Sequence, residues 1–197
     1  MMENSATGRR FPSLLKNLFL LTLPGLIFTL LLLELFFRFV VPACEMPSVY
    51  FDPTDRILRY DTRGRKEGIA TLGKWGEGRA RWRINNYGWN SEIDYAPAEG
   101  PHRPLLALIG DSYIDALQVD VADNIAAQTR RALGGGYQIY SFGIGGAPLS
   151  QYLLMSRYVR RHFNPSVMVF NVVHNDFDES LVELENMPYF LELSFQG

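Results

Sequence analysis

Three short clusters in this sequence combine glycines with residues that can take part in acyl-group chemistry. A serine hydroxyl attacks a carbonyl carbon once a base takes its proton, and backbone N–H groups or a carboxamide stabilise the resulting oxyanion. The clusters are Gly110-Asp111-Ser112, Gly143-Ile144-Gly145-Gly146 and His174-Asn175-Asp176. Taken singly, each cluster is equally typical of a turn or a helix cap, so only their placement in a fold favours a site.

Each cluster directly follows an apolar run of the kind that forms a buried parallel strand. The runs are residues 104–109, 137–142 and 166–173, with helical spacing over residues 121–133 and 149–163 between them. This alternation predicts an α/β domain with a parallel sheet and right-handed crossovers. Because ligands of such sheets bind beyond the carboxyl ends of the strands, we expect the three clusters to meet at one edge.

Together and in this order, the clusters resemble those of the SGNH/GDSL hydrolase family, and the stretch GDSYIDALQVD is similar to that family beyond its first three residues. The likeness covers residues 104–178 and is best with the membrane-anchored branch that is associated with cell-envelope glycans. It implies a three-layer flavodoxin-like fold without a metal or an organic cofactor. It also implies a serine esterase or O-acyltransferase-like protein whose substrate is an acylated envelope polysaccharide.

The resemblance also implies roles for individual residues. Ser112 matches the nucleophile, Gly146 matches a glycine whose backbone N–H lines the oxyanion hole, and Asn175 matches the asparagine that adds its side-chain amide. The Ser112 N–H is the third donor of such a site. Asp111 and Asp176 are interpreted as supporting residues that hold their loops by accepting backbone hydrogen bonds.

The catalytic base is the main departure from the family pattern. The family takes its histidine from a late Asp-x-x-His motif, and no histidine follows Asp176 in this chain. His174 precedes Asn175 and is expected to point to the opposite face of the strand, His162 ends a predicted helix, and His102 lies in a predicted linker. The sequence identifies no carboxylate partner for any of them. A smaller departure is Val173, where the family usually has glycine.

Three strands are fewer than the family's sheet contains, and residues 188–197 add no closing helix. We therefore expect residues 101–197 to be the first part of a longer hydrolase domain, a fragment whose base comes from a downstream segment. The alternative is a non-catalytic membrane-anchored protein that binds a glycan or a partner with the same fold. A nucleotide-binding domain is disfavoured because no phosphate-type glycine loop follows the first strand.

Residues 18–41 form an apolar run interrupted only by Glu34 and Arg38. As a helix these residues span roughly 36 Å, enough to cross the hydrocarbon core of a bilayer. Glu34 and Arg38 share a helix face and are expected to pair, and Pro24-Gly25 is a predicted kink. A cleavable signal peptide, a lipoprotein signal ending at Cys44 and a buried core helix all match this run less well than a membrane anchor does.

Charge sets the predicted topology. Arg9, Arg10 and Lys16 precede the apolar run, so residues 1–17 are predicted to be a cytoplasmic tail and everything after the helix to be extracytoplasmic. The net charge of −2 and the dispersed basic residues give no reason to expect a nucleic-acid partner. Cys44 is the only cysteine, which excludes an intrachain disulfide.

Residues 45–100 are predicted to be a β-rich preface to the hydrolase domain. The segments 57–60 and 80–84 suit short strands, and residues 86–88 suit a turn. Residues 97–101 are predicted to form a linker between the preface and residues 101–197.

Overall fold

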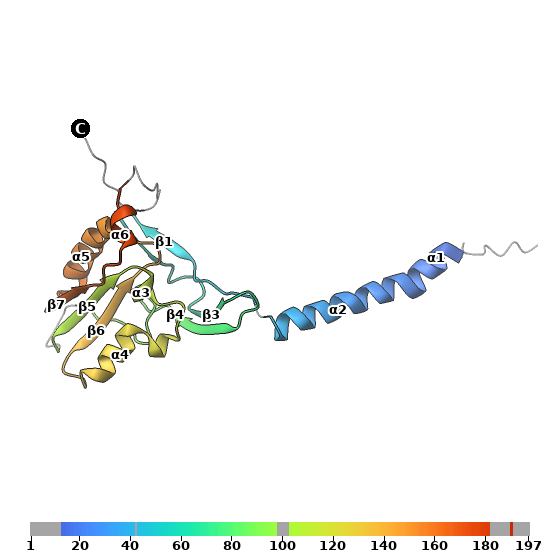
Figure 1. Cartoon of the computed structure of the whole chain (residues 1–197), viewed down its shortest axis with the longest axis horizontal. Helices are drawn as coiled ribbons and strands as arrows, with labels where there is room; N and C mark the ends of the chain where they lie inside the picture. Colours follow the sequence, from blue (N-terminus) through green and yellow to red (C-terminus); the bar gives the residue numbers. More distant parts are fainter. Residues whose placement is uncertain (1–12, 42, 98–102, 182–189, 191–197) are drawn as a thin grey trace, which may run out of the picture. The chain divides into compact units, whose positions relative to one another are not determined.

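The computed structural model of the chain describes residues 13–41, 43–97, 103–181 and 190. These residues belong to two compact units, Met1–Ala43 and Cys44–Gly197, and each unit is described by itself (Figure 1).

The first unit is a continuous helical segment made of α1 (Ser13–Asn17), a π-helical turn (Leu18–Thr22) and α2 (Leu23–Phe39). Residues Leu15–Phe39 are long and apolar enough to cross a membrane, at roughly 37 Å for 25 residues. The helix begins earlier than expected, because residues 13–17, which were predicted to belong to the tail, continue it. The rest of that predicted tail, residues 1–12, lies outside the described residues.

Proline accounts for the change of winding in this helix. Pro24 has no N–H to donate to the carbonyl four residues earlier, and the preceding turn is wound as a π-helix in which the Leu23 N–H donates to the Leu18 carbonyl. The predicted pairing of Glu34 with Arg38 is confirmed at 4.0 Å.

The second unit contains a parallel sheet of three strands, β5 (Leu105–Gly110), β6 (Gln138–Gly143) and β7 (Val167–Phe170), in the order β6-β5-β7. The predicted parallel α/β arrangement is therefore confirmed. Each strand after the first is reached through helices: α3 (Ser112–Asp115) and α4 (Ile125–Ala132) precede β6, and α5 (Leu149–Phe163) precedes β7. The bounds of α5 coincide with the predicted helix.

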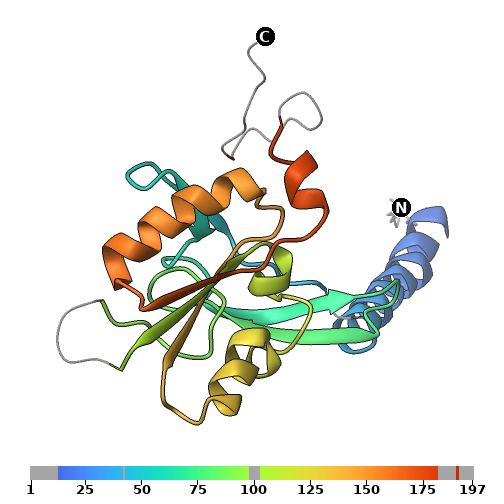
Figure 2. The ribbon, with the colours of Figure 1, turned by 60° about the vertical axis from the view of Figure 1, so that its left-hand side comes forward.

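Side chains of β5 alternate between two apolar clusters, one on each face of the sheet. Leu105, Ala107 and Ile109 pack in the larger cluster with α5, whereas Leu108 packs with Ile114 of α3 and with α4. Figure 2 shows α5 on one side of the sheet and α4 on the other. A strand covered on both faces needs apolar residues at every position, which is why residues 104–109 form a continuous apolar run.

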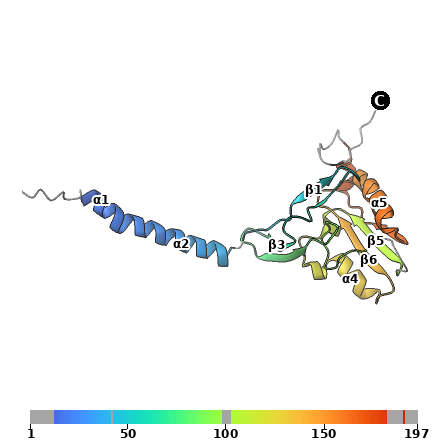
Figure 3. The same ribbon diagram turned by 180° about the vertical axis from the view of Figure 1, so that it is seen from behind.

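Residues 44–97 form two antiparallel hairpins, as a β-rich preface would (Figure 3). The first pairs β1 (Val49–Asp52) with β2 (Ile57–Tyr60), and the second pairs β3 (Glu67–Leu72) with β4 (Gly78–Arg83). The predicted strand at residues 57–60 is confirmed. These hairpins share one compact unit and one apolar cluster with the sheet.

Two expected elements differ from the structure. The strand expected at residues 166–173 is shorter, and Val167, Val169 and Phe170 are exposed, because β7 pairs only with β5 among the described strands. The helix expected at residues 121–133 is divided into a 3₁₀ turn (Val121–Asp123) and α4 by Asn124, whose extended backbone and side chain cap α4 by accepting from the Ala127 N–H at 2.9 Å.

Trp89 joins the preface to the sheet. Its side chain is fully buried, and its ring meets Phe142 of β6 edge-on at 5.4 Å and Tyr158 of α5 at 5.9 Å between centroids. Tyr95 stacks on Tyr140 at 3.9 Å. The core of the α/β part is therefore completed by residues that precede it in the chain.

We predict that Trp89→Ala lowers the free energy of unfolding by about 3–5 kcal/mol, because it leaves a cavity between β6 and α5. Urea unfolding of the detergent-solubilised chain, followed by circular dichroism, measures this change. Trp75→Ala is the matched control, since Trp75 is exposed and its loss is expected to cost less than about 0.5 kcal/mol. Equal effects of the two substitutions would contradict a shared core.

Candidate active site

The carboxyl ends of the three parallel strands meet at one edge of the sheet. Gly110 at the end of β5 pairs with Gly143 at the end of β6, and the Asn171 N–H just beyond β7 donates to the Ile109 carbonyl at 2.8 Å. The loops that carry Ser112, Gly146 and Asn175 all leave the sheet from this edge. The convergence expected from the order of the elements is thus present in the fold.

Ser112 is the first residue of α3 and is partly exposed. Asp111 caps this short helix by accepting from the Tyr113 N–H at 3.0 Å, and its other carboxylate oxygen accepts from the Ser112 hydroxyl at 3.3 Å. The second bond is long for an O–H···O contact, so the hydroxyl is only weakly held. Asp111 makes the loop hydrogen bond expected of it.

Glycines allow the second loop to pass close to Ser112. A Cβ on Gly143 would overlap with the backbone of Asp115 and Ile114, so this position lets α3 pack against the end of β6. A Cβ on Gly145 would lie 3.9 Å from the Ser112 Cβ, which places this loop beside the serine. Gly146 has a φ of 78°, a left-handed conformation that favours glycine, and faces open space.

A buried carboxyl group, Asp115, lies beneath Ser112 and was not singled out from the sequence. Its Oδ2 accepts from the Tyr60 hydroxyl at 2.8 Å and its carboxyl group also accepts from the Gly145 backbone, while its Oδ1 has no partner among the described residues. The Asn90 amide donates to the Asp115 carbonyl at 2.7 Å. Burial raises the pKa of Asp115 to about 7, opposed by the Tyr60 hydrogen bond. Two preface residues therefore hold the turn that follows the serine.

This carboxyl group predicts how stability depends on pH. The native chain retains the Asp115 proton between pH 3.8 and about 7 whereas the unfolded chain releases it, so the free energy of unfolding falls as pH rises through this window, by up to roughly 1.4 kcal/mol per pH unit. Asp115→Asn, which cannot ionise, is expected to remove that fall and to exceed the wild type in stability at pH 8. Urea unfolding at several pH values measures the difference.

Tyr60→Phe is the partner variant in the same experiment. The Tyr60 hydrogen bond lowers the pKa of Asp115, so its removal should raise that pKa further. The fall in the free energy of unfolding should then extend to higher pH than in the wild type. If wild type and Asp115→Asn have the same pH profile, Asp115 is not protonated in the native chain at neutral pH.

The third loop is held by a second buried carboxyl group. Asp176 accepts from the Val173 N–H at 2.8 Å and from the Tyr152 hydroxyl at 2.9 Å. The backbone of Asp111 bonds to the same hydroxyl, so Tyr152 of α5 connects the first loop to the third. Burial, followed by the bond to Asp176, raises the pKa of Tyr152. Asp176 thus makes the backbone hydrogen bond expected of a supporting residue.

Asn175 begins the short helix α6 (Asn175–Asp178). Its amide donates to the Glu179 carboxylate at 2.6 Å, within its own loop. The order of the elements therefore brings Asn175 to the same edge of the sheet as Ser112. Its amide, however, donates to Glu179 and to no described atom of the Ser112 loop.

Neither of the described histidines hydrogen-bonds to the serine hydroxyl. His162 has a carboxylate partner that the sequence did not reveal, because its Nε2 lies 3.1 Å from the Asp55 carboxylate of the β1–β2 turn. It stands at the far end of α5, a helix about 22 Å long whose first residue follows the second loop. His174 is exposed at the start of α6, and His102 is outside the described residues.

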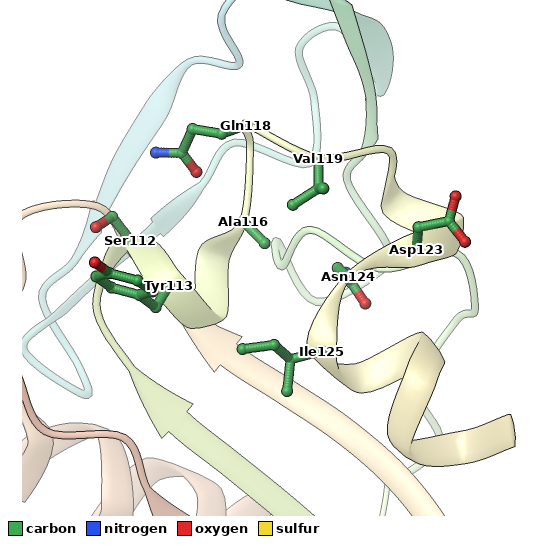
Figure 4. Close-up of a pocket in the computed structure, with 8 residues that line it drawn as sticks. All are labelled: Ser112, Tyr113, Ala116, Gln118, Val119, Asp123, Asn124 and Ile125. Carbon is green, nitrogen blue, oxygen red and sulfur yellow. The ribbon is translucent and has the colours of Figure 1, made fainter. Parts of the chain in front are cut away.

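A pocket of about 480 Å³ opens between α3 and α4 beside Ser112 (Figure 4). Figure 4 shows the Gln118 amide turned toward the serine end of the pocket and Asp123 pointing away from it. Tyr113, Val119 and Ile125 give the pocket exposed apolar side chains and four other lining residues are polar, so it suits a ligand with both polar and apolar parts. Its lining residues are Ser112, Tyr113, Ala116, Gln118, Val119, Asp123, Asn124 and Ile125.

Comparison of the chain with models of protein families, with curated proteins and with solved structures gives no match. Within residues 13–41, 43–97, 103–181 and 190, no group of three or more His, Cys, Asp or Glu side chains is arranged to hold a metal ion.

Proposed function

We propose that this chain is a membrane-anchored SGNH/GDSL-type serine esterase or O-acyltransferase-like protein that acts on acyl esters of an envelope polysaccharide. The proposal rests on one observation above all. Ser112 stands, weakly hydrogen-bonded and partly exposed, at the carboxyl end of the central parallel strand, with the Gly145 loop beside it and a pocket in front of it. A flavodoxin-like sheet of the SGNH type is the fold that this order of strands supports.

In the proposed reaction the Ser112 hydroxyl oxygen attacks the ester carbonyl while a base takes its proton. The Ser112 N–H, the Gly146 N–H and the Asn175 amide stabilise the tetrahedral oxyanion. For this the Asn175 amide must leave the Glu179 carboxylate and donate to the oxyanion instead. The partly exposed position of Asn175 at the start of α6 permits this change. The leaving alkoxide takes up the proton, and the acyl-serine then passes its acyl group to water or to a sugar hydroxyl.

No described histidine is in place to act as the base of this reaction, because none of them hydrogen-bonds to Ser112. His162 is held by Asp55 at the far end of α5. The reaction therefore depends on a base beyond the described residues, and Ser112 remains a neutral hydroxyl without it.

We also propose that the helix Leu15–Phe39 anchors the protein in the membrane with its N-terminus in the cytoplasm. Its length and apolar composition support the anchor. Arg9 and Arg10 before the helix and Lys16 in its first turn support the orientation, which places residues 44–197 outside the cytoplasm, where envelope polysaccharide is found.

A non-catalytic protein that binds a glycan or a partner is the second candidate function. The engagement of the Asn175 amide by Glu179 and the position of His162 favour it. In this case the pocket beside Ser112 would bind an acylated sugar without cleaving it.

Covalent capture of Ser112 by a fluorophosphonate probe tests the catalytic proposal. We expect the probe to label Ser112 faster than any other serine of the folded chain, since oxyanion stabilisation acts even without a base, and to lose this selectivity in urea. Peptide mass spectrometry locates the label, and Ser112→Ala is the control. Equal labelling of Ser112 and of exposed serines elsewhere, both without and with added imidazole as the base, would reject the enzyme and leave the binding protein.

A further inference from the structure

The tip of the β3–β4 hairpin carries an exposed tryptophan. Trp75 is 58% exposed, whereas Trp82 and Trp89 are 1% and 0% exposed. Two glycines in left-handed conformation, Gly73 and Gly76, shape the turn, and the Trp75 N–H donates to the Glu77 carboxylate at 3.2 Å. The turn therefore places Trp75 at the tip with its side chain exposed.

The tip has the composition of a membrane-interface segment. Leu72 is exposed beside Trp75, although it belongs to the face of the hairpin on which Ala70 and Ala80 are buried. Lys74 lies over the Trp75 ring at 5.9 Å. Tryptophan with nearby cations is typical of the headgroup level of a bilayer, where the ring contacts both lipid tails and water.

The hairpin also has a net positive charge, with four basic and two acidic side chains between residues 67 and 83. Lys74, Arg79 and Arg81 are exposed and form no ion pair with any described residue, and Arg79 and Arg81 project from the same face of β4. The Glu77 carboxylate accepts from the Trp75 N–H, and the Asp120 carboxylate accepts from the Arg81 N–H at 2.6 Å, so the basic side chains outnumber the acidic groups near them without being free of them. Exposed cations of this kind are attracted to anionic lipid headgroups.

Only a short stretch of chain separates the apolar helix from the residues that bond to the hairpin. The Thr71 N–H donates to the Cys44 sulfur at 3.4 Å and the Glu45 N–H donates to the Ile69 carbonyl at 2.9 Å, so residues 44–45 run along β3 as far as the tip. Cys44 is three residues after Val41, a span of at most about 11 Å. This limit follows from the number of residues and holds for every arrangement of the two units.

We propose that the segment Leu72–Gly78 is a second membrane contact that inserts Trp75 and Leu72 at the headgroup level of an anionic bilayer. This inference rests on the proposed membrane anchor, because the short connecting chain allows the tip to reach the bilayer only if the helix spans it. The contact would hold the domain at the membrane surface instead of leaving it free to swing on its tether.

Tryptophan fluorescence of the full chain reconstituted in vesicles tests the contact. The chain has three tryptophans and none lies in the apolar helix, so Trp75 alone is available to the lipid. In phosphatidylcholine–phosphatidylglycerol vesicles with bromine near the headgroup end of the acyl chains, we expect the emission contributed by Trp75 to be quenched, and that of the two buried tryptophans to remain. Bromine deeper in the chains should quench less, and acrylamide in the water should have little effect on Trp75.

Trp75→Phe is the matched variant and should leave only the unquenched emission of Trp82 and Trp89. Replacing Lys74, Arg79 and Arg81 together with glutamine should weaken the quenching. Flotation of the vesicles on a density gradient reports the anchor separately. A chain that floats but keeps Trp75 unquenched by lipid and open to acrylamide overturns the hairpin contact and leaves the anchor intact. A chain that does not float overturns the anchor and the contact with it.

Discussion

The 197-residue chain is expected to hydrolyse p-nitrophenyl acetate only slightly faster than the uncatalysed reaction until imidazole is added. The Ser112 hydroxyl bonds to the Asp111 carboxylate at 3.3 Å and to no described histidine, so nothing described takes its proton during attack. An assembled oxyanion hole and a bound substrate set an upper limit of about 10³–10⁴-fold acceleration without a triad. The chain is expected to stay well below this limit, because the Asn175 amide is bonded to Glu179. Imidazole that diffuses to Ser112 replaces the missing base, and general-base catalysis is typically worth a factor of about 10²–10⁴.

The informative quantity is the rate difference between wild type and Ser112→Ala at equal imidazole concentration, since imidazole also cleaves this ester directly. We expect a Ser112-dependent rate that rises with imidazole and is absent from the variant. Asn175→Ala should then lower the remaining rate by about a hundredfold or more if its amide leaves Glu179 for the oxyanion.

Fast Ser112-dependent turnover without imidazole would contradict the assignment of the histidines. His174→Gln would then be the first variant to measure, because His174 is next to Asn175 and exposed at the start of α6. No Ser112-dependent rate at any imidazole concentration would favour the non-catalytic protein.

An all-or-none result is expected from reporters fused after Gly197. A reporter that works only outside the cytoplasm should be active, and one that works only inside should be silent, because basic residues precede the helix and acidic residues such as Glu45 and Asp52 follow it. Changing Arg9, Arg10 and Lys16 to glutamate removes the bias and should mix the two orientations. Activity of the cytoplasm-only reporter on the unchanged chain would overturn the topology and with it the proposed access to envelope polysaccharide.

Residues of the preface help to position the candidate site through hydrogen bonds to it. Tyr60 and Asn90 bind the side chain and the carbonyl of Asp115, and Asp115 binds the Gly145 backbone beside Ser112. The serine loop and the glycine loop are thus positioned relative to one another by residues that precede the parallel sheet. This arrangement explains why residues 44–97 share a core with the sheet instead of forming a separate domain.

The elements of this protein can be predicted from the sequence because short-range patterns encode them. The continuous apolar run at residues 104–109 identifies a strand buried on both faces, the spacing at residues 149–163 identifies α5, and the run at residues 18–41 identifies a helix long enough for a membrane. The order of these elements implies a parallel sheet, and a parallel sheet brings the loops with Ser112, Gly146 and Asn175 to one edge. The meeting of these loops at one edge can therefore be predicted without knowing how the side chains pack.

Only the tertiary structure decides which side chains meet. Tyr60 and Asp115 are 55 residues apart, and Asp55 and His162 are 107 apart, so no periodicity or spacing relates them. Asp115 belongs to the serine block and could have been noticed as a carboxylate in an otherwise apolar turn, but its burial depends on a hairpin from the preface. The exposure of β7 likewise depends on which strands pair, because the same apolar residues would be buried between two neighbours. Local propensity determines the elements, whereas the protonation of Asp115 and the partners of His162 and Asn175 depend on packing between distant segments.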